Sequence, residues 1–235
     1  MDYCDIFGFF IEMDKTLIAV AHLDPNPNLI PSETAMKNIL QINASLFGEN
    51  GESSKLADRF VEKLLKQYPE ARHIKRDLAS DPVPHLDAER FGAFLAQPEQ
   101  RSPAQRAAVE YSDTLIAELK AADVIVLGLP MYNFGVPSTL KAYFDHVARA
   151  GHTFRYTANG PVGLLTGKKA YVFSARGGLY TGTPWDTETD YVRVFLRFLG
   201  IEDVEFVYAE GLAISPQSKE TGLNKAAAAL ERLAA

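Results

Sequence analysis

The chain has 235 residues, 47% of them hydrophobic, and a formal net charge of −6 at pH 7. Residues 1–35 carry six acids and one lysine, a net of −5, so only −1 of that charge (−6 minus −5) belongs to residues 36–235. A chain of this length can bury one sizeable core, and a nearly neutral domain has no basic patch for nucleic acid or an anionic membrane, so small molecules are the expected partners.

The first 35 residues differ from the rest. Their apolar runs are broken by acids and lack a basic start, so we expect neither a membrane span nor a secretion signal. Three prolines between Asp24 and Pro31 predict a linker. The only cysteine, Cys4, lies here, so residues 36–235 have no thiol and a reducing cytoplasm is the expected location. We therefore expect an extension over 1–35, either appended or made from an upstream start codon, and a working domain over 36–235.

From Met36 onward, strand patterns alternate with helix patterns. Residues 38–44 predict a first strand, and residues 47–53 predict a turn that ends in a helix N-cap signal. The helix that follows has an apolar stripe at four-residue spacing, formed by Leu56, Phe60 and Leu64. Residues 71–78 alternate polar and apolar side chains, which indicates a strand at the edge of a sheet.

The most apolar strand pattern runs from Val124 to Leu129 without a charge, as in a parallel strand that is covered on both faces. A long helix precedes it and begins near Pro103, which is favourable in a first helical turn. The remaining predicted elements are a helix from Pro137, strands over 170–174 and 204–208, and helices over 187–199 and 215–233.

Five strands that alternate with helices predict an α/β fold, a three-layer sandwich with a parallel sheet covered on both faces. The order 2-1-3-4-5 places the polar second strand at an edge. This is a flavodoxin-like topology, and its ligand site is expected at the carboxyl ends of the first and third strands.

The loop after the first strand combines hydroxyls, glycines and a helix N-terminus. Ser45 and Ser53 supply the hydroxyls, Gly48 and Gly51 supply flexibility, and the free helix amides suit a phosphate monoester. The alternative is that Ser53 only caps the helix and the glycines only form a turn. No GxGxxG or GxxxxGK[ST] motif is present, which disfavours dinucleotides and nucleoside triphosphates.

The loop after the third strand is unusually aromatic. Met131, Tyr132 and Phe134 are a costly way to build an exposed turn, whereas a planar heterocycle would contact their side chains and bond to Asn133 and the backbone. These residues could instead close the edge of the core.

The loop after the fourth strand is Ala175-Arg176-Gly177-Gly178, where paired glycines let backbone amides approach a ligand closely. A plain tight turn is the alternative. Because three such loops meet at one edge of the sheet, a ligand site is favoured over three separate turns.

Other chemistry is not indicated. There is no GxSxG elbow, and no metal site is expected because the five histidines lack metal-ligand spacing. They are His22, His73, His85, His146 and His152.

Residues 36–235 resemble the FMN-dependent NADH-azoreductases of the flavodoxin-like quinone reductase superfamily. The resemblance covers essentially the whole domain and rests on long, collinear motifs. These are Pro-Met-Tyr-Asn-Phe at 130–134, Leu-Lys-Ala-Tyr-Phe-Asp at 140–145, Gly-His-Thr-Phe-Arg-Tyr-Thr at 151–157, Gly-Pro at 160–161, the turn at 175–178, and Phe-Val-Tyr-Ala-Glu-Gly at 206–211.

The resemblance implies an FMN site made from the three loops. The phosphate would sit on Ser45 and on Gly51, Glu52 and Ser53; the ring would contact residues 131–134, and its other edge would meet Ala175, Arg176, Gly177 and Gly178. The chain departs from the family pattern at Gly51 and Glu52, where small polar residues are common, and at Ala175, where a serine is common. The Glu52 carboxylate must therefore either point away from the phosphate or weaken its binding.

The resemblance also implies a two-electron ping-pong reaction. NADH or NADPH would pass hydride to the flavin and leave, and a quinone or azo compound would then be reduced in the same pocket. No side chain is expected to be catalytic, because the flavin carries the chemistry. Tyr156 and Phe154 are candidates for a substrate-stacking wall presented across a homodimer interface, with ordinary loop packing as the alternative.

Two other functions stay open from the sequence. A flavodoxin-like electron carrier would use the same fold to pass single electrons to a protein, and a binding module would use it without flavin. The near-neutral domain and the extra loop from Gly151 to Gly167, interpreted as a pocket wall, favour the enzyme over the carrier.

Overall fold

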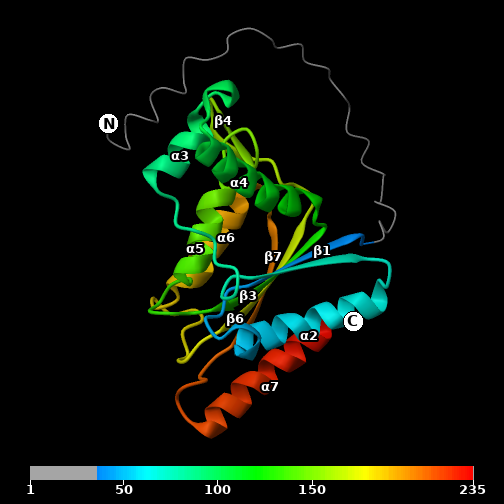
Figure 1. The fold of residues 1–235 in the computed structure, drawn as a ribbon. Helices are drawn as coiled ribbons and strands as arrows, with labels where there is room; N and C mark the ends of the chain where they lie inside the picture. Colours follow the sequence, from blue (N-terminus) through cyan, green and yellow to red (C-terminus); the bar gives the residue numbers. More distant parts are fainter. Residues whose placement is uncertain (1–35, 235) are drawn as a thin grey trace. The chain divides into compact units, whose positions relative to one another are not determined.

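The computed structural model describes residues 36–234, so the predicted extension over 1–35 lies outside the described residues. The described part is built on a five-stranded parallel sheet in the order β2-β1-β3-β6-β7 (Figure 1). This order confirms the predicted flavodoxin-like 2-1-3-4-5 topology. The strands are β1 (Asn38–Asn43), β2 (Arg72–Asp77), β3 (Val124–Pro130), β6 (Lys169–Ala175) and β7 (Asp203–Ala209).

The burial of each strand follows from its place in the sheet. All seven residues of β3 are buried, because β1 and β6 flank it and helices cover both faces. β2 lies at the edge and has no buried residue, which confirms the prediction made from its polar alternation. Its Arg76 forms a two-pronged ion pair with Glu118, with nitrogen to oxygen distances of 2.5 and 2.7 Å.

Two layers of helices cover the sheet. Helices α2 (Glu52–Gln67) and α7 (Pro216–Leu233) pack on one face of the sheet (Figure 1). Phe60 of α2 is fully buried there. Helices α4 (Pro103–Ala121), α5 (Ser138–Val147) and α6 (Thr187–Leu199) pack on the other face. The apolar stripes predicted from the sequence are the faces that these helices bury.

Gly128 explains how closely α2 approaches the centre of the sheet. A Cβ at this position would lie 2.9 Å from Asn43 Oδ1 and 3.2 Å from the carbonyl oxygen of Ser53. Since real Cβ atoms do not approach other atoms so closely, the small residue in β3 lets the first turn of α2 rest on the strand. The start of this helix is thereby fixed against β1 and β3.

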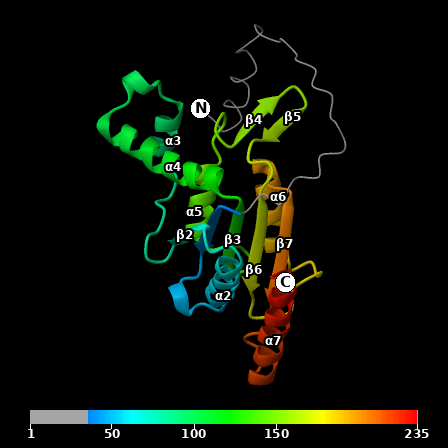
Figure 2. The same cartoon turned by 90° about the vertical axis from the view of Figure 1, so that its right-hand side faces the viewer.

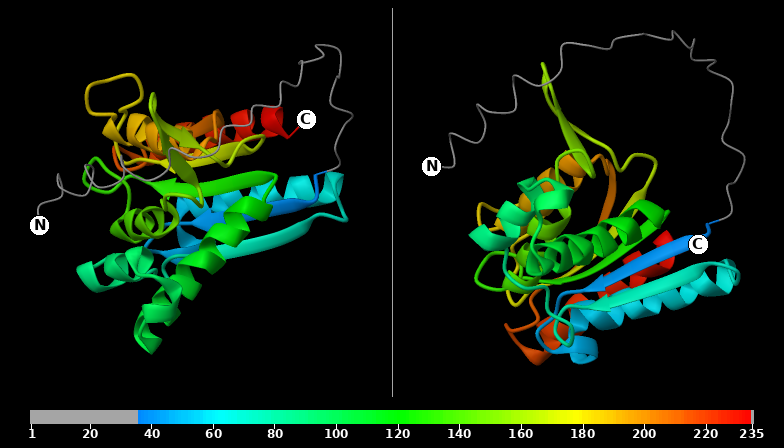
Figure 3. Two further views of the ribbon diagram at one scale, coloured as in Figure 1. Left: turned by 90° about the horizontal axis from the view of Figure 1, so that it is seen from above. Right: turned by 45° about the horizontal axis from the view of Figure 1, so that its top comes forward.

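Several elements were not predicted. The proline-containing connection after β2 holds a short helix, α3 (Ala88–Leu95), capped by the Asp87 side chain, and a 3-10 turn, η2 (Pro98–Gln100). Another 3-10 turn, η1 (Gly48–Asn50), lies before α2. The segment interpreted as a pocket wall forms a hairpin of β4 (Phe154–Thr157) and β5 (Gly160–Gly163), which projects from the rest of the domain (Figures 2 and 3).

Candidate functional site

The first loop at the carboxyl edge of the sheet is packed around Ser45. This side chain is 1% exposed, and its Oγ accepts a hydrogen bond of 3.2 Å from the Phe47 amide. A Cβ at Gly51 would lie only 2.1 Å from Ser45 Oγ. Glycine is therefore required at position 51 for the Ser45 hydroxyl to lie against the start of α2.

The N-terminus of α2 presents donors without acceptors. Its N-cap is Gly51, which makes no side-chain cap, and the Lys55 amide donates the first helical bond, of 3.0 Å, to the Gly51 carbonyl. The amides of the three preceding residues have no helical acceptor. Ser53 is the second residue of the helix, so the alternative that it only caps the helix is wrong.

The Ser53 hydroxyl strengthens the case for an anion at this position. Ser53 is 1% exposed, and its Oγ has no hydrogen-bond partner within the described part of the chain. A buried hydroxyl without a partner is costly. A phosphate placed at the helix N-terminus would accept bonds from this hydroxyl and from the free amides, and the positive end of the helix dipole would favour its charge.

Glu52, which brings a negative charge to this loop, forms ion pairs with two lysines. Its Oε1 lies 2.9 Å from Lys219 Nζ on α7, and its Oε2 lies 3.8 Å from Lys55 Nζ. Both carboxylate oxygens are thus engaged by cations. This pairing reduces the repulsion that Glu52 would exert on a phosphate.

The second loop is a tight reverse turn with an unusual backbone. Tyr132 and Gly135 exchange two backbone hydrogen bonds of 3.0 Å, and the residues between them, Asn133 and Phe134, have φ of +49° and +64°. Two positive φ values in succession define a type I′ turn, which asparagine tolerates and phenylalanine rarely adopts. Both side chains are exposed, and backbone strain of this kind clusters at functional sites.

Tyr132 reaches from the second loop to the first. Its phenol oxygen lies 3.5 Å from Ser45 Oγ and accepts a 3.3 Å hydrogen bond from the Leu46 amide. The Met131 amide, in turn, donates a 3.0 Å bond to the Ala175 carbonyl. These contacts join the second loop to the first and to the third.

The backbone carbonyls of the third loop are hydrogen-bonded within the domain. The carbonyl oxygens of Arg176, Gly177 and Gly178 accept bonds from the backbone amides of residues 211–213, at 2.8 to 3.1 Å. Within residues 36–234, the amides of Gly177 and Gly178 donate no hydrogen bond. The third loop therefore offers two free amide donors.

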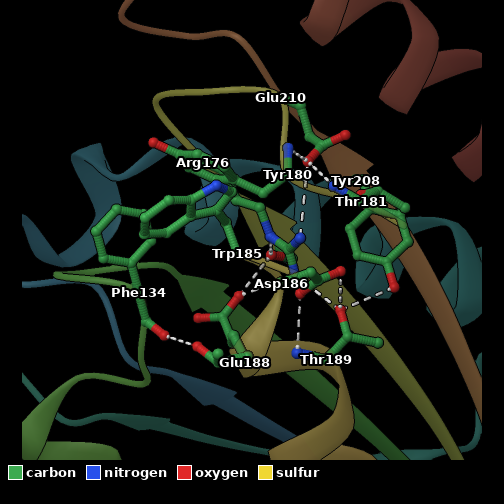
Figure 4. Close-up of polar contacts among 12 residues, drawn as sticks. Phe134, Arg176, Tyr180, Thr181, Trp185, Asp186, Glu188, Thr189, Tyr208 and Glu210 are labelled. Carbon is green, nitrogen blue, oxygen red and sulfur yellow. Dashed lines mark hydrogen bonds and ion pairs between the residues drawn. The ribbon is translucent and has the colours of Figure 1, made fainter. Parts of the chain in front are cut away.

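The Arg176 side chain is buried inside the domain, 1% exposed, and does not reach the open edge (Figure 4). Its Nη2 lies 2.9 Å from Asp186 Oδ1 and 3.3 Å from Glu188 Oε2, and its Nη1 lies 3.6 Å from Glu210 Oε1. The guanidinium also lies over the ring of Tyr208. Only the backbone of Arg176 is left for the cofactor contact predicted at this residue.

Glu188 is the most perturbed carboxyl of this cluster. Burial raises its pKa to about 7, against the opposing effects of the Ser174 hydroxyl and of Arg176. Its Oε2 accepts a 2.9 Å bond from Ser174, whereas its Oε1 has no partner in the described residues. Sequence reasoning missed this carboxyl, because an acid in the first turn of a helix is common and gives no sign of burial.

Phe154 and Tyr156 lie at the opposite end of the sheet from the three loops. Phe154 is 6% exposed, and its ring packs 4.3 Å from that of Phe198 near the end of α6. The Leu165 amide just beyond the hairpin bonds to the Leu199 carbonyl, where the chain enters β7. The structure therefore separates these two residues from the other predicted site residues of the same chain.

No helix between residues 36 and 234 is long and apolar enough to cross a membrane. In the same range, no group of three histidine, cysteine or acidic side chains could hold a metal ion.

Known proteins match both the sequence and the fold. A family model described as the flavodoxin-like fold matches residues 37–234. An FMN-dependent NADH:quinone oxidoreductase of Cellvibrio japonicus is 58% identical over 75% of this chain and 89% of its own length. FMN-dependent NADH:quinone oxidoreductase 6 of Burkholderia lata is 51% identical over 85% of this chain and 100% of its own length.

Solved structures agree with these relatives. The FMN-dependent NADH-azoreductase of Bacillus anthracis, solved in complex with FMN, is 30% identical and superposes with a TM-score of 0.75. The superposition covers 85% of this chain and all of the bacillary one. An azoreductase from the Sterne strain of the same species has a TM-score of 0.78 at 27% identity, over 85% of this chain and 99% of its own.

Proposed function

The chain belongs to the flavodoxin-like fold family and, within it, to the FMN-dependent NADH:quinone oxidoreductases, and we propose on this basis how its own residues serve that activity. It is an FMN-dependent oxidoreductase that reduces quinones and azo compounds with NADH or NADPH. Its cofactor site consists of the three loops at the carboxyl edge of the sheet.

The observation that carries this assignment is the buried Ser53 hydroxyl without a partner at the start of α2. The donors present fit the phosphate of FMN, because Ser53 and the first amides of the helix can all donate to it. Ser45 is held beside Gly51 and completes the phosphate loop. Glu52 is tolerated there because Lys55 and Lys219 pair with its carboxylate.

The other two loops would hold the ring system. Asn133 and Phe134 are exposed on the strained turn, where they can contact a ring from the side. The free amides of Gly177 and Gly178 can donate to a ring edge and stabilise negative charge that develops there. Bound FMN supplies the chemistry, taking hydride from the nicotinamide and returning two electrons to the acceptor.

We also propose that the enzyme is a homodimer in which Tyr156 of the partner subunit completes the substrate site. Tyr156 is 44% exposed on a projecting hairpin, at the end of the sheet opposite its own cofactor loops. It cannot reach the flavin of its own chain from there. Phe154, by contrast, is buried and supports the hairpin from below, so its ring is not available to a substrate.

A cytoplasmic location is part of the same proposal. The absence of cysteine from residues 36–235 suits a reducing compartment, and the nicotinamide donors are small molecules of that compartment. The nearly neutral charge of this range is consistent with small-molecule acceptors and gives no reason to invoke nucleic acid.

The test is purification followed by flavin titration and steady-state kinetics. We expect one FMN per chain, and parallel double-reciprocal lines when NADH is varied at several concentrations of a quinone or an azo dye. Failure to take up FMN would overturn the assignment. Uptake of FMN with only single-electron transfer to a protein would favour the electron carrier.

A further inference from the structure

Three aromatic rings lie together beside the strained turn, although they come from two separate loops (Figure 4). The ring of Phe134 lies 5.3 Å from that of Trp185 and 5.5 Å from that of Tyr180, measured between centroids. Trp185 is 62% exposed and Phe134 is 43% exposed. Exposed aromatic side chains that touch one another at a candidate site indicate a binding surface.

The loop that carries Trp185 is held in place from the interior. Glu210 Oε1 accepts bonds of 2.8 and 2.9 Å from the amides of Tyr180 and Thr181, at the start of this loop. At its end, Asp186 is paired with the buried Arg176 guanidinium. The same buried arginine faces Glu210, so both ends of the loop are anchored to one cluster of charges.

The Phe134 turn and the Tyr180 ring are fixed as well. The Thr187 hydroxyl donates to the carbonyl oxygen of Phe134, which ties the turn to the start of α6. The Tyr180 ring lies directly over Gly178, where a Cβ would be 2.5 Å from its Cζ atom. The exposed rings are therefore presented by a rigid support, as expected of a binding surface that is formed before the ligand arrives.

We infer that Phe134, Tyr180 and Trp185 form a ring-binding face for the electron acceptor, and that Trp185 makes the enzyme prefer fused-ring acceptors to single-ring ones. This inference rests on the proposed function, because it takes the flavin to lie on the turn that carries Phe134. A single ring over the flavin can contact Phe134 alone. A fused ring system extends to the Trp185 ring, which is tilted by 39° to the Phe134 ring with its centroid 5.3 Å away, and contacts that ring too.

The experiment compares 9,10-anthraquinone-2-sulfonate, a fused-ring acceptor, with duroquinone, a single-ring one. For Trp185→Ala we expect the KM for the anthraquinone to rise roughly three- to tenfold, which is the value of one aromatic contact. The KM for duroquinone should rise much less, because a single ring contacts Phe134 alone, so the ratio of the two KM values should shift in favour of duroquinone. Trp185→Phe should restore most of the preference, because it keeps a ring at this position.

A direct binding measurement separates this inference from the proposed function. Calorimetric titration of the purified protein with the anthraquinone, without NADH, should show the same rise in Kd for Trp185→Ala. In the wild type, Trp185 is the only tryptophan of the chain, so its emission reports binding at this position. The matched control is Tyr68→Ala, which removes a 37% exposed aromatic ring at the far end of α2.

Three results for Trp185→Ala would overturn the ring-binding face. They are an equal rise in KM for both quinones, a change confined to the KM for NADH, or an unchanged Kd for the anthraquinone. Failure of the proposed function would be visible separately, as absence of FMN uptake and of duroquinone reduction by the wild type. The calorimetric comparison still tests Trp185 in that case. Because this side chain is largely exposed, its truncation is not expected to unfold the domain.

Discussion

The phenol oxygen of Tyr132 lies 3.5 Å from Ser45 Oγ, so a side chain of the loop after β3 reaches the loop after β1. The same oxygen accepts a 3.3 Å bond from the Leu46 amide. Both distances are long for hydrogen bonds, so each contact contributes little free energy on its own. Together they fix the spacing of these two loops, which in the proposed site bind opposite ends of FMN.

Removing this hydroxyl should loosen the cofactor site only slightly. For Tyr132→Phe we expect the Kd for FMN to rise about two- to fivefold, as for the loss of a weak hydrogen bond. Quenching of flavin fluorescence during titration of the apoprotein measures it. A loss of a hundredfold or more would contradict the bridging role and would indicate that the hydroxyl itself binds the phosphate.

Ser53→Ala should separate cofactor binding from stability. The Kd for FMN should rise by about tenfold or more, because a bond to a charged phosphate is lost. The apoprotein should keep its melting temperature or gain a little, since the deleted hydroxyl is buried without a partner. Thermal unfolding of the apoprotein and flavin titration measure the two effects.

The control for Ser53 is a serine that does cap a helix. Ser102 Oγ accepts a 3.2 Å bond from the Gln105 amide at the start of α4. Ser102→Ala should lower the free energy of unfolding of the apoprotein by about 1 kcal/mol and leave the Kd for FMN unchanged. An equal loss of apoprotein stability in Ser53→Ala would show that Ser53 has an internal partner.

Glu188 should make stability depend on pH. Its pKa is raised to about 7 from an ordinary 4.5, so the folded state holds the proton more tightly than the unfolded state. The stability that this carboxyl contributes is fully present below pH 4.5 and is lost as the pH rises through 7. Glu188→Gln should therefore gain up to about 3 kcal/mol relative to wild type between pH 5 and pH 8.

Denaturant unfolding at the two pH values checks this expectation. The control is Glu202→Gln, which replaces an exposed carboxyl in the connection between α6 and β7 and should show no such gain. If Glu188→Gln is destabilised equally at both values, Glu188 is ionised throughout and serves as a fixed partner of Arg176.

Mixed dimers can test whether Tyr156 acts across an interface. One variant, Tyr156→Ala, should have an intact flavin site but a defective hairpin. The other, Gly51→Val, should lose the flavin site, because its side chain would collide with Ser45. Statistical mixing should restore about a quarter of the wild-type turnover, since half of the dimers contain one complete site.

The reference for this experiment is each variant dimer alone, purified and mixed without subunit exchange. Turnover of the exchanged mixture that stays at the sum of the separate dimers would place Tyr156 on the site of its own chain. Size-exclusion chromatography of the wild type must also show a dimer, because a monomeric protein would have no such interface.

The backbone conformation of Asn133 should tolerate glycine but not alanine. At φ of +49°, alanine should lower the free energy of unfolding by about 1 kcal/mol, whereas glycine should not. If the Asn133 side chain also contacts FMN, both variants should raise the Kd for FMN by similar factors. Chemical denaturation and flavin titration of the two variants separate the backbone from the side chain.

The sheet order and the three loops were predictable because their signals are local. A strand covered on both faces must be apolar, as 124–129 is, and a polar strand must lie at an edge, as 72–77 does. The hydroxyls and glycines of the phosphate loop are adjacent in the sequence. The position of the β4–β5 hairpin also follows from topology, because α5 returns the chain to the amino end of the sheet.

The burial of Arg176 was not predictable from its surroundings in the chain. Its partners Asp186 and Glu188 are ten or more residues away, and Glu210 comes from the end of a different strand. A charged residue next to two glycines is typical of an exposed loop, and only the three-dimensional arrangement of three carboxylates makes its burial possible. The cluster of Trp185 with Phe134 depends on the same long-range contacts.

The close contact at Gly128 ties the cofactor site to the cooperativity of the whole domain. The first turn of α2 packs directly against the central strand at Gly128, so detaching this turn would expose the most buried strand of the sheet. Many ligand loops open as separate low-energy units, but this one is continuous with the most buried part of the sheet. Across a denaturant titration, the capacity to bind FMN should therefore disappear in the same transition as the sheet itself.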